Sequence, residues 1–327
     1  MLCSGKYNFS FDVEGGVIEA PEPETADDSL RFETPPAGPL IRHVRRHFPP
    51  TLITDPRVLA VIEHIERDHS VAHPLAELAA QTGVSPFHLH RLFAEAMGET
   101  IGGFMRRERL DAAAIHLLSS PDSIQDIAAT VGYGSLAAFN HAFHRQFGVA
   151  PTRYRELARQ AVIHVSDDDH ARAKRVRVET REVLPLVGMR FYGNYAAAES
   201  YWLRFAGILQ GLGIALDGLQ AYARIVDNPQ ITPDGLIRYH CAVRDPGLSD
   251  PLPPPLTRYV AQAGRYATLR HRGPYREVFP AYFAISPVWM HKHGERFGLS
   301  PALERYESPP WKHAGGEQSI TVMINLR

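Results

Sequence analysis

Residues 73–98, HPLAELAAQTGVSPFHLHRLFAEAMG, decide the fold of the first half of the chain. Pro74 suits the first position of a helix, and Gly83 can take a tight turn that residues with a Cβ atom resist. Ser85 can then cap a second helix through its side-chain oxygen. Apolar residues recur at helical spacing on both sides of the turn: Leu75, Leu78, Ala79, Leu89, Leu92, Phe93 and Ala96. The stretch therefore predicts a helix-turn-helix unit.

Residues 122–148, DSIQDIAATVGYGSLAAFNHAFHRQFG, repeat this plan. Ser123, with Asp126 three residues later, resembles a capping box in which Asp replaces Glu. Gly132 and Gly134 flank the expected turn. Phenylalanine then occupies every fourth position of the second helix, at Phe139, Phe143 and Phe147. The chain is therefore expected to carry two helix-turn-helix units.

Residues 100–120, TIGGFMRRERLDAAAIHLLSS, predict one helix between the two units. Its roughly 18 helical residues would span about 27 Å at 1.5 Å per residue. Successive major grooves on one face of DNA are about 34 Å apart. A rigid helix of this length could hold two recognition helices on adjacent grooves, so that one chain reads two half-sites without dimerising.

Residues 50–158 resemble the AraC/XylS-type DNA-binding domain, an all-α double helix-turn-helix. The motifs that carry the resemblance are LAAQTGVSPFHLHRLF, RRERLDAAAIHLL and SIQDIAATVGYGSLAAFNHAFHRQFGVAPTRYR. The resemblance implies that the second helix of each unit meets base edges, through Phe87, His90, Arg91, Leu136, Ala137, Asn140 and His141. Arg91 suits guanine, Asn140 suits adenine, and Leu136 or Ala137 suits a thymine methyl group. Each of these residues is also compatible with a solvated helix face, and the family usually has arginine where His141 stands.

The charge of this region is unusual for a DNA-binding domain. Residues 50–160 hold ten arginines, no lysine, and twelve aspartates and glutamates, a formal charge of −2. We therefore expect clustered arginines to attract phosphate: Arg106, Arg107, Arg109, Arg153 and Arg155. DNA binding should weaken steeply with salt and strengthen from about pH 8 to about pH 6 as histidines become charged. The run HLH does not predict a metal site, because helix positions two apart do not share a face. Neither HLH nor HAFH has an evident third ligand in the sequence.

Residues 176–327 have a different composition, with all three tryptophans and ten of the thirteen tyrosines. Strand-like stretches appear here, so the boundary between domains is expected near residue 170. Residues 159–175, which include SDDDHARAKR, suit a charged linker. Residues 1–48 are acidic and rich in Pro and Gly, and they predict a flexible tail.

Two stretches of this second half are similar to each other. RFYGNYAAAESYWLRF (190–205) and RHRGPYREVF (270–279) each run from a strand through Gly-Asn-Tyr or Gly-Pro-Tyr into an aromatic helix. They predict an α+β domain built from two pseudo-symmetric strand-helix-strand-strand units. A cleft along the shared axis of such units is a natural pocket.

The second half resembles the GyrI-like small-molecule-binding domain. The motifs are VGMRFYGNY, IVDNPQITPDGLIRYHCAV, GRYATLRHRGPYREVFPAYF, VWMHKHGERFGLSPALERYESPP and SITVMINLR. The resemblance implies a ligand-binding glutamate in an aromatic pocket, here Glu304. A carboxylate among aromatic rings suits a flat organic cation. The expected walls, which are equally compatible with a core, are Tyr192, Tyr195, Tyr239, Tyr275, Phe279, Trp289 and Trp311.

The two resemblances together imply a one-component transcriptional regulator with the order of Rob-type regulators. Its expected partners are double-stranded DNA, a small-molecule effector and RNA polymerase, with no cofactor and no metal. Two alternatives stay open: a hydrolase of reactive small molecules that uses Glu304 as a base on water, and a protein-binding module that shields a topoisomerase. The fused DNA-binding half favours sensing over catalysis, so the chain is not expected to be an enzyme. Two cysteines, no membrane-spanning run and no signal pattern predict the cytoplasm.

Overall fold

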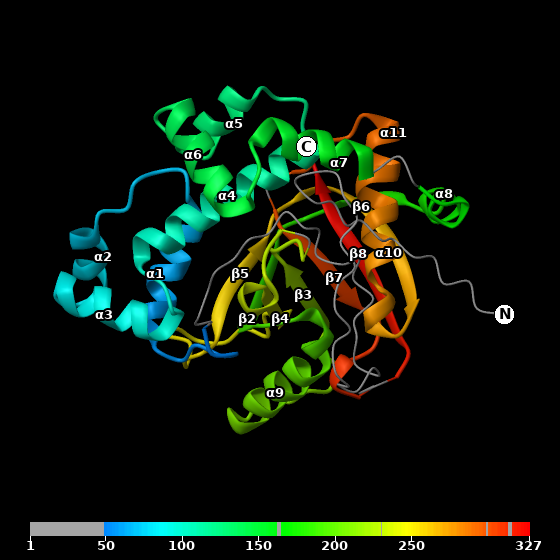
Figure 1. Cartoon of the computed structure of the whole chain (residues 1–327). Coiled ribbons are helices and arrows are strands. Elements are labelled where there is room, and N and C mark those ends of the chain that lie inside the picture. The colour runs from blue at the N-terminus through cyan, green and yellow to red at the C-terminus, as the bar shows by residue number, and fades with distance from the viewer. Residues whose placement is uncertain (1–48, 162–164, 230, 299, 313–315) are drawn as a thin grey trace, which may run out of the picture.

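The computed structural model describes residues 49–327, apart from 162–164, 230, 299 and 313–315. The predicted tail, residues 1–48, lies outside the described residues. The chain folds into a helical half followed by a half dominated by one β-sheet (Figure 1). Both parts of the predicted fold class, an all-α helix-turn-helix region and an α+β region, are therefore present.

The helical half contains both predicted helix-turn-helix units. Its helices are α1 (Pro56–Arg67), α2 (Leu75–Thr82), α3 (Pro86–Met97), α4 (Ile101–Ser119), α5 (Ile124–Thr130), α6 (Leu136–Phe147) and α7 (Pro151–Ala161). Ser85 caps α3 by accepting a hydrogen bond from the backbone N–H of His88, and Ser123 caps α5 in the same way. Gly83 ends α2 with φ = 68°, in the left-handed region that the predicted turn requires.

Each unit has its own apolar core, and α4 belongs to both. Leu78, Leu89 and Phe93 pack with Phe104 near the start of α4. The three phenylalanines of α6 pack with residues nearer the end of α4: Leu110, Ala113, Ala114 and Leu117. The 19 residues of α4 correspond to about 28 Å, so the helix holds the two units apart as a rod.

The second half contains one antiparallel eight-stranded sheet in the order β1-β6-β8-β7-β3-β4-β2-β5. Its strands are β1 (Arg177–Arg181), β2 (Leu184–Tyr192), β3 (Ala221–Ile225), β4 (Arg238–Arg244), β5 (Thr257–Ala261), β6 (Gly264–Gly273), β7 (Ala302–Tyr306) and β8 (Gln318–Leu326). The short strands β1 and β5 form its edges, and β7 pairs with β3 at its centre.

Helices cover one face of this sheet, and the helical half of the chain lies against the other (Figure 1). The covering elements are α8 (Asp167–Ala173), the 3₁₀ turn η3 (Tyr195–Ala197), α9 (Ala198–Gly211), the 3₁₀ turn η5 (Tyr275–Glu277), α10 (Phe279–Phe283), the π-helical turn η6 (Ala284–Met290), α11 (His291–His293) and the 3₁₀ turn η7 (Pro310–Lys312). A further 3₁₀ turn, η4 (Asp234–Leu236), precedes β4.

Part of the predicted linker is the helix α8. Ser166 and Asp169 form a reciprocal capping box at its start. The acidic residues of the first turn stabilise the helix by interacting with the positive end of its dipole. Ala173 packs into the core beneath α10 and η6. The charged stretch that was predicted as a linker therefore also contains the capping residues of a short helix.

The Gly-x-Tyr motif has the same backbone in both places. Gly193 has φ = 140° and Gly273 has φ = 141°, values that side chains with a Cβ atom rarely adopt. Gly193 directly follows β2 and Gly273 is the last residue of β6, and each glycine precedes a 3₁₀ turn that begins at Tyr195 or Tyr275. A Cβ atom on Gly193 would lie 2.4 Å from the hydroxyl of Tyr201, so this glycine is also required by close packing.

Candidate functional site

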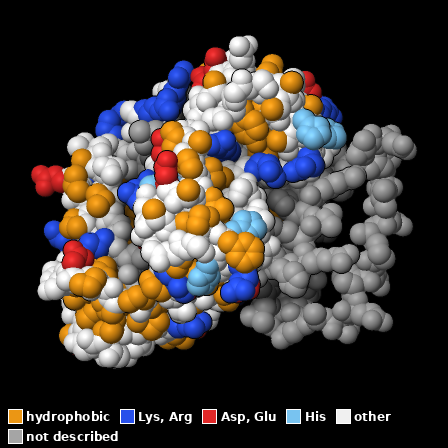
Figure 2. Space-filling model, turned by 90° about the vertical axis from the view of Figure 1, so that its left-hand side faces the viewer, with side chains coloured by type: hydrophobic (Ala, Val, Ile, Leu, Met, Phe, Trp, Pro, Cys, Tyr) orange, Lys and Arg blue, Asp and Glu red, His pale blue; other side chains and the backbone are white. Residues whose placement is uncertain are grey.

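The residues predicted to read DNA lie exposed on α3 and α6. Phe87 is 79% exposed and Leu136 39% exposed, both unusual for large apolar side chains. The remaining predicted readers are also exposed: His90, Arg91, Ala137, Asn140 and His141. Figure 2 views the molecule from the side on which these helices lie in Figure 1, with basic and histidine side chains between apolar ones.

The arginines predicted to attract phosphate fall into two groups. Arg106 and Arg153 are exposed. Arg107 is buried and forms ion pairs with Glu99, Glu108 and Asp111. Arg109 donates hydrogen bonds to four backbone carbonyls at 2.7–3.3 Å, those of His69, Ser70, Val71 and Gly132. The prediction for Arg107 and Arg109 was therefore wrong, because both guanidinium groups are occupied by contacts within the helical half. Arg155 is half-buried and donates a hydrogen bond to the backbone carbonyl of Asp122 at 2.6 Å.

The second candidate site is the carboxylate of Glu304, at the centre of the sheet. Glu304 is on β7, opposite Ala223 of β3 and Val322 of β8, and its exposure is 0%. Its Oε1 accepts hydrogen bonds from the hydroxyls of Tyr275, at 3.2 Å, and Tyr282, at 2.9 Å. Its Oε2 accepts one from Tyr306, at 3.2 Å. We call Glu304 and these three tyrosines the carboxylate cluster.

Aromatic residues extend the carboxylate cluster toward α9. The hydroxyls of Tyr306 and Tyr239 lie 2.8 Å apart, and the indole N–H of Trp202 donates to Tyr239 at 3.0 Å. Tyr195 packs edge-on against Tyr239, with ring centroids 6.0 Å apart. A chain of hydrogen bonds therefore runs from Glu304 to α9 through two tyrosines.

The electrostatics of the carboxylate cluster are those of an uncompensated charge. Burial raises the pKa of Glu304 to about 7, although the tyrosine hydrogen bonds act in the opposite direction. Burial and the nearby carboxylate raise the pKa of Tyr275, Tyr282 and Tyr306 well above the ordinary value, so their hydroxyls remain donors. Within the described part of the chain, no Lys, Arg or His forms an ion pair with Glu304.

The predicted pocket walls divide between several places. Tyr239 and Tyr275 join the hydrogen-bond network of Glu304, and Tyr195 lies beside it. Tyr192 lies on the opposite face of the sheet and packs into the core of the first helix-turn-helix unit. Trp289 stacks on His293, with ring centroids 4.6 Å apart. Phe279 begins α10 and is half-buried.

The sequence interpretation did not select Tyr282, Tyr306 or Trp202 for this site. A signal for Tyr306 was present, because it follows Glu304 by two positions on a strand and must share its face. Tyr282 follows Tyr275 by seven positions, about two helical turns, which could have suggested that both rings point the same way.

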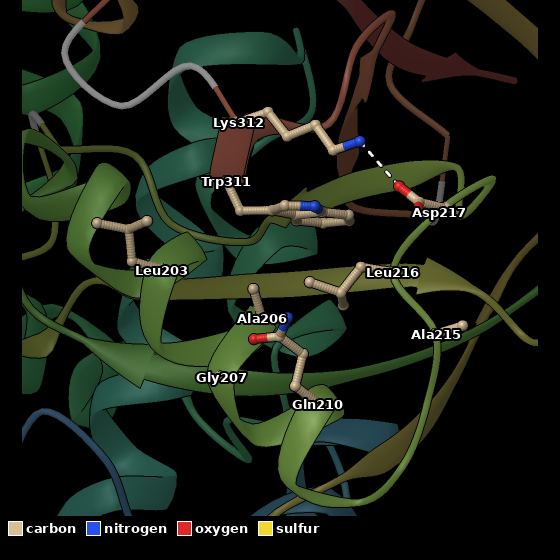
Figure 3. Close-up of a pocket in the computed structure, with 9 residues that line it drawn as sticks. All are labelled: Leu203, Ala206, Gly207, Gln210, Ala215, Leu216, Asp217, Trp311 and Lys312. Carbon is tan, nitrogen blue, oxygen red and sulfur yellow. Dashed lines mark hydrogen bonds and ion pairs between the residues drawn. The ribbon is translucent and has the colours of Figure 1, made fainter.

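A surface pocket of about 470 Å³ lies beyond Trp202, between α9 and η7 (Figure 3). In Figure 3 the ring of Trp311 lies over Ala206 and Leu216, and Lys312 closes one side through an ion pair with Asp217 at 2.8 Å. The Trp311 ring is 5.9 Å from that of Trp202, which in turn packs 5.1 Å from Tyr306. The rings of Trp311 and Trp202 therefore form a continuous line of contacts from the pocket to Tyr306 of the carboxylate cluster.

Two other kinds of site were sought in the described residues. No three His, Cys, Asp or Glu side chains there lie close enough together to hold a metal ion. In the same part of the chain, no helix has the length and apolar character needed to cross a bilayer.

Comparison with known proteins identifies both halves. Residues 78–157 match the family model of a helix-turn-helix domain, and residues 174–327 match that of the GyrI-like small molecule binding domain. The chain therefore joins an AraC-type helix-turn-helix domain to a C-terminal GyrI-like domain.

Individual relatives resemble only part of the chain. The HTH-type transcriptional regulator Rv1931c of Mycobacterium tuberculosis is 35% identical over 85 residues, 26% of this chain and 33% of that protein. The right origin-binding protein of Escherichia coli is 37% identical over 81 residues, 25% of this chain and 28% of that protein. The solved DNA-binding domain of the transcriptional factor AdpA, in complex with a target DNA, is 26% identical and covers 34% of this chain and 99% of its own, with a TM-score of 0.31. The chain thus spans a third or less of the length of these two curated relatives.

Proposed function

We propose that the chain is a one-component transcriptional regulator that binds DNA through α3 and α6 and senses a small aromatic cation through Glu304. The observation that carries the sensing role is a buried carboxylate that has tyrosine donors and, among residues the structure describes, no paired cation. Burial of an unpaired charge costs free energy that an entering cation would recover. Such a regulator would act in the cytoplasm, where DNA and RNA polymerase are available to it.

The DNA-binding role rests on the two exposed recognition helices joined by α4. An arginine and an asparagine at Arg91 and Asn140 supply the side-chain types that make bidentate contacts to guanine and adenine. Phe87 and Leu136 are exposed apolar side chains suited to thymine methyl groups. Arg106, also exposed, is suited to a phosphate contact.

In vitro selection from a random DNA pool with the full chain tests this role. The full chain should enrich a sequence with two half-sites, and Arg91→Ala should then lose about 1–3 kcal/mol of binding free energy for it. Arg204→Ala, which removes an exposed arginine from α9, is the matched control and should bind as the unaltered chain does. Absence of any enriched sequence would refute DNA binding.

The sensing role assigns ligand contacts to residues around Glu304. Tyr239 and Tyr275 would supply ring faces and hydroxyls once the ligand displaces their hydrogen bonds, and Tyr195 would flank them. Trp311 borders the surface pocket on the same side of the sheet. We propose that a ligand enters at this pocket and displaces the buried Trp202 to reach the carboxylate.

We also propose that the sheet has a pseudo-twofold axis between β3 and β7. Read outward from this pair, the strand order is β3-β4-β2 on one side and β7-β8-β6 on the other. The matching φ angles of Gly193 and Gly273 support the same relation. The proposed domains are residues 50–158 and 176–327, and Glu304 then lies next to the axis.

Isothermal titration with 1-methyl-4-phenylpyridinium tests the sensing role, because this aromatic cation is permanently charged. The full chain should bind it and change its affinity for the selected DNA, and Glu304→Gln should lose both effects. Tetraphenylphosphonium, a bulkier cation, measures how much room the site allows. If neither cation binds and Glu304→Gln leaves stability unchanged, the sensing role is refuted.

The near-neutral pKa of Glu304 also suits a general base, which keeps the hydrolase as the second candidate. In that reaction Glu304 takes a proton from water, the water oxygen bonds to a carbon of a strained ring, and the ring carbon–oxygen bond breaks. The leaving oxygen then takes the proton from Glu304, which restores the carboxylate. Incubation with styrene oxide and chromatography for the diol decides between the candidates. Diol formation that Glu304→Gln abolishes would favour the hydrolase.

A further inference from the structure

The C-terminal half contacts both helix-turn-helix units, through the sheet face opposite Glu304 and through the segment before β4. Tyr192 of β2 packs into the core of the first unit, with Leu78, Leu89 and Phe93. Ile231, in the segment before β4, packs into the core of the second unit. The two units are therefore joined by the C-terminal half as well as by α4.

Buried ion pairs reinforce this contact. One guanidinium nitrogen of Arg238 on β4 donates to Glu66 at the end of α1, at 2.6 Å, and to Glu108 of α4, at 2.8 Å. Its other nitrogens donate to Asp227 at 2.9 and 2.5 Å. Arg190 of β2 also donates to Glu66, at 2.5 Å. We call Glu66, Glu108, Arg190, Arg238 and Asp227 the interdomain network.

All five side chains of the interdomain network are largely buried: Arg238 is 3% exposed, Glu66 14% and Glu108 8%. Burial by itself would raise the pKa of Glu66, but Arg190 and Arg238 lower it to about 2. The network therefore stays charged, and separation of the halves would break the ion pairs of Glu66 with Arg190 and Arg238 and that of Glu108 with Arg238.

Strand β4 connects the interdomain network to the carboxylate cluster. Successive residues of a strand point to opposite faces, so Tyr239 faces Glu304 while its neighbours Arg238 and His240 face the helical half. Tyr239 is two hydrogen bonds from Glu304, through Tyr306. His240 lies 3.3 Å from a guanidinium nitrogen of Arg190. A displacement of Tyr239 thus acts on the peptide unit that also positions Arg238.

We propose that the C-terminal sheet is a brace that holds the two helix-turn-helix units at one spacing, and that β4 makes this spacing responsive to the carboxylate cluster. The proposal rests on the proposed DNA binding and adds its regulation. With the brace intact, the recognition helices fit only half-sites at one separation. A ligand that displaces Tyr239 loosens the brace, which widens the range of half-site separations.

The brace is tested with Glu66→Gln/Glu108→Gln, which removes two charges and keeps the side-chain shapes. An insertion of one base pair between the half-sites of the selected DNA should lower the DNA affinity of the full chain at least tenfold. The same insertion should lower the affinity of the double variant less than threefold. Glu295→Gln, which breaks the peripheral ion pair with Arg265, is the control. The insertion should lower its DNA affinity as much as that of the full chain. An equal penalty in the double variant would overturn the brace. If the double variant does not fold, Glu66→Gln alone is compared, with the same criterion.

The route through β4 is tested by hydrogen exchange without any ligand or DNA. Tyr239→Phe and Tyr282→Phe each remove one hydroxyl near Glu304, but only Tyr239 is on β4. Tyr239→Phe should increase amide exchange in α1 and α4 at least threefold, and Tyr282→Phe should leave it unchanged. Equal responses would overturn the route. This measurement also judges the brace if selection enriches no DNA, because exchange in α1 and α4 must then still rise in the Glu66→Gln/Glu108→Gln variant.

Discussion

Glu66 and Glu304 are largely buried carboxylates on opposite faces of one sheet: Glu66 belongs to α1, which packs against one face, and Glu304 projects from β7 on the other. Glu66 lies between Arg190 and Arg238, which lower its pKa to about 2 against the effect of burial. Among the described residues, the hydrogen-bond partners of Glu304 are tyrosine hydroxyls, and burial raises its pKa to about 7. At Glu66, the positive charges of the arginines outweigh the effect of burial on the pKa. At Glu304, the neutral tyrosine donors do not. Glu66 is therefore a charge that holds the fold together, and Glu304 is the charge that we propose is available for a ligand.

The largest expected effect on stability concerns Glu66 and the arginines that compensate its charge. Arg238→Met should destabilise the chain by about 3–5 kcal/mol, because Glu66, Glu108 and Asp227 lose their shared partner. Urea denaturation measures the change. Arg265→Met breaks a more exposed ion pair and should cost less than about 1 kcal/mol. Similar costs for the two variants would mean that the interdomain network contributes no more than a surface pair.

The pH dependence of stability should have opposite signs for the two carboxylates. The pKa of Glu304 is raised in the folded chain, so its favourable contribution is complete below about pH 4.5 and is lost as the pH rises through about 7. The stability of the unaltered chain relative to Glu304→Gln should therefore fall by about 3 kcal/mol between pH 4 and pH 8.

Glu66→Gln provides the opposite case. The pKa of Glu66 is lowered, so its contribution is complete above about pH 4.5 and is lost as the pH falls through about 2. Urea denaturation at several pH values measures both variants. If both differences have the same sign, the assignment of one compensated and one uncompensated charge is wrong.

Ligand affinity should also follow the ionisation of Glu304. Affinity for 1-methyl-4-phenylpyridinium is expected to rise about tenfold from pH 6 to pH 8, as a carboxyl with a pKa near 7 becomes charged. The cation itself does not titrate, so calorimetry reports the protein group. In Glu304→Gln, the residual affinity should not change over this range.

The smallest expected effect is that of one hydrogen bond to Glu304. Tyr282→Phe removes the shortest of its tyrosine contacts, at 2.9 Å, which should cost about 0.5–1.5 kcal/mol of carboxylate stabilisation. The pH midpoint of cation binding should move upward as a result. Tyr266→Phe removes a hydroxyl that bonds to the backbone of Gln262, and it should leave the midpoint in place.

The local signals of the sequence predicted the helical half well. Ser85, Ser123 and Gly83 form the expected caps and turn, because these features depend on neighbouring residues. The resemblance to a GyrI-like domain led to Glu304, and the structure places it among the tyrosines Tyr239 and Tyr275. Whether any of these residues contacts a ligand stays a prediction.

The contacts between halves could not be predicted in the same way. Glu66 and Arg238 are 172 positions apart, and nothing around either residue indicates the other. Arg106 and Arg107 are neighbours of one type, yet one is exposed and the other buried, because helical position and tertiary packing decide between them. Tyr192 could have been excluded from the pocket, because side chains alternate along β2 and Tyr192 therefore points to the face of the sheet opposite that of Phe191.

The position of Trp202 has a practical consequence. All three tryptophans of the chain belong to residues 176–327, and the indole N–H of Trp202 is bonded to Tyr239, one hydroxyl away from the carboxylate cluster. Intrinsic indole fluorescence therefore reports on the C-terminal half alone. A dye attached to DNA can report on the other half at a different wavelength. Stopped-flow mixing with both signals would show which half of the molecule responds first.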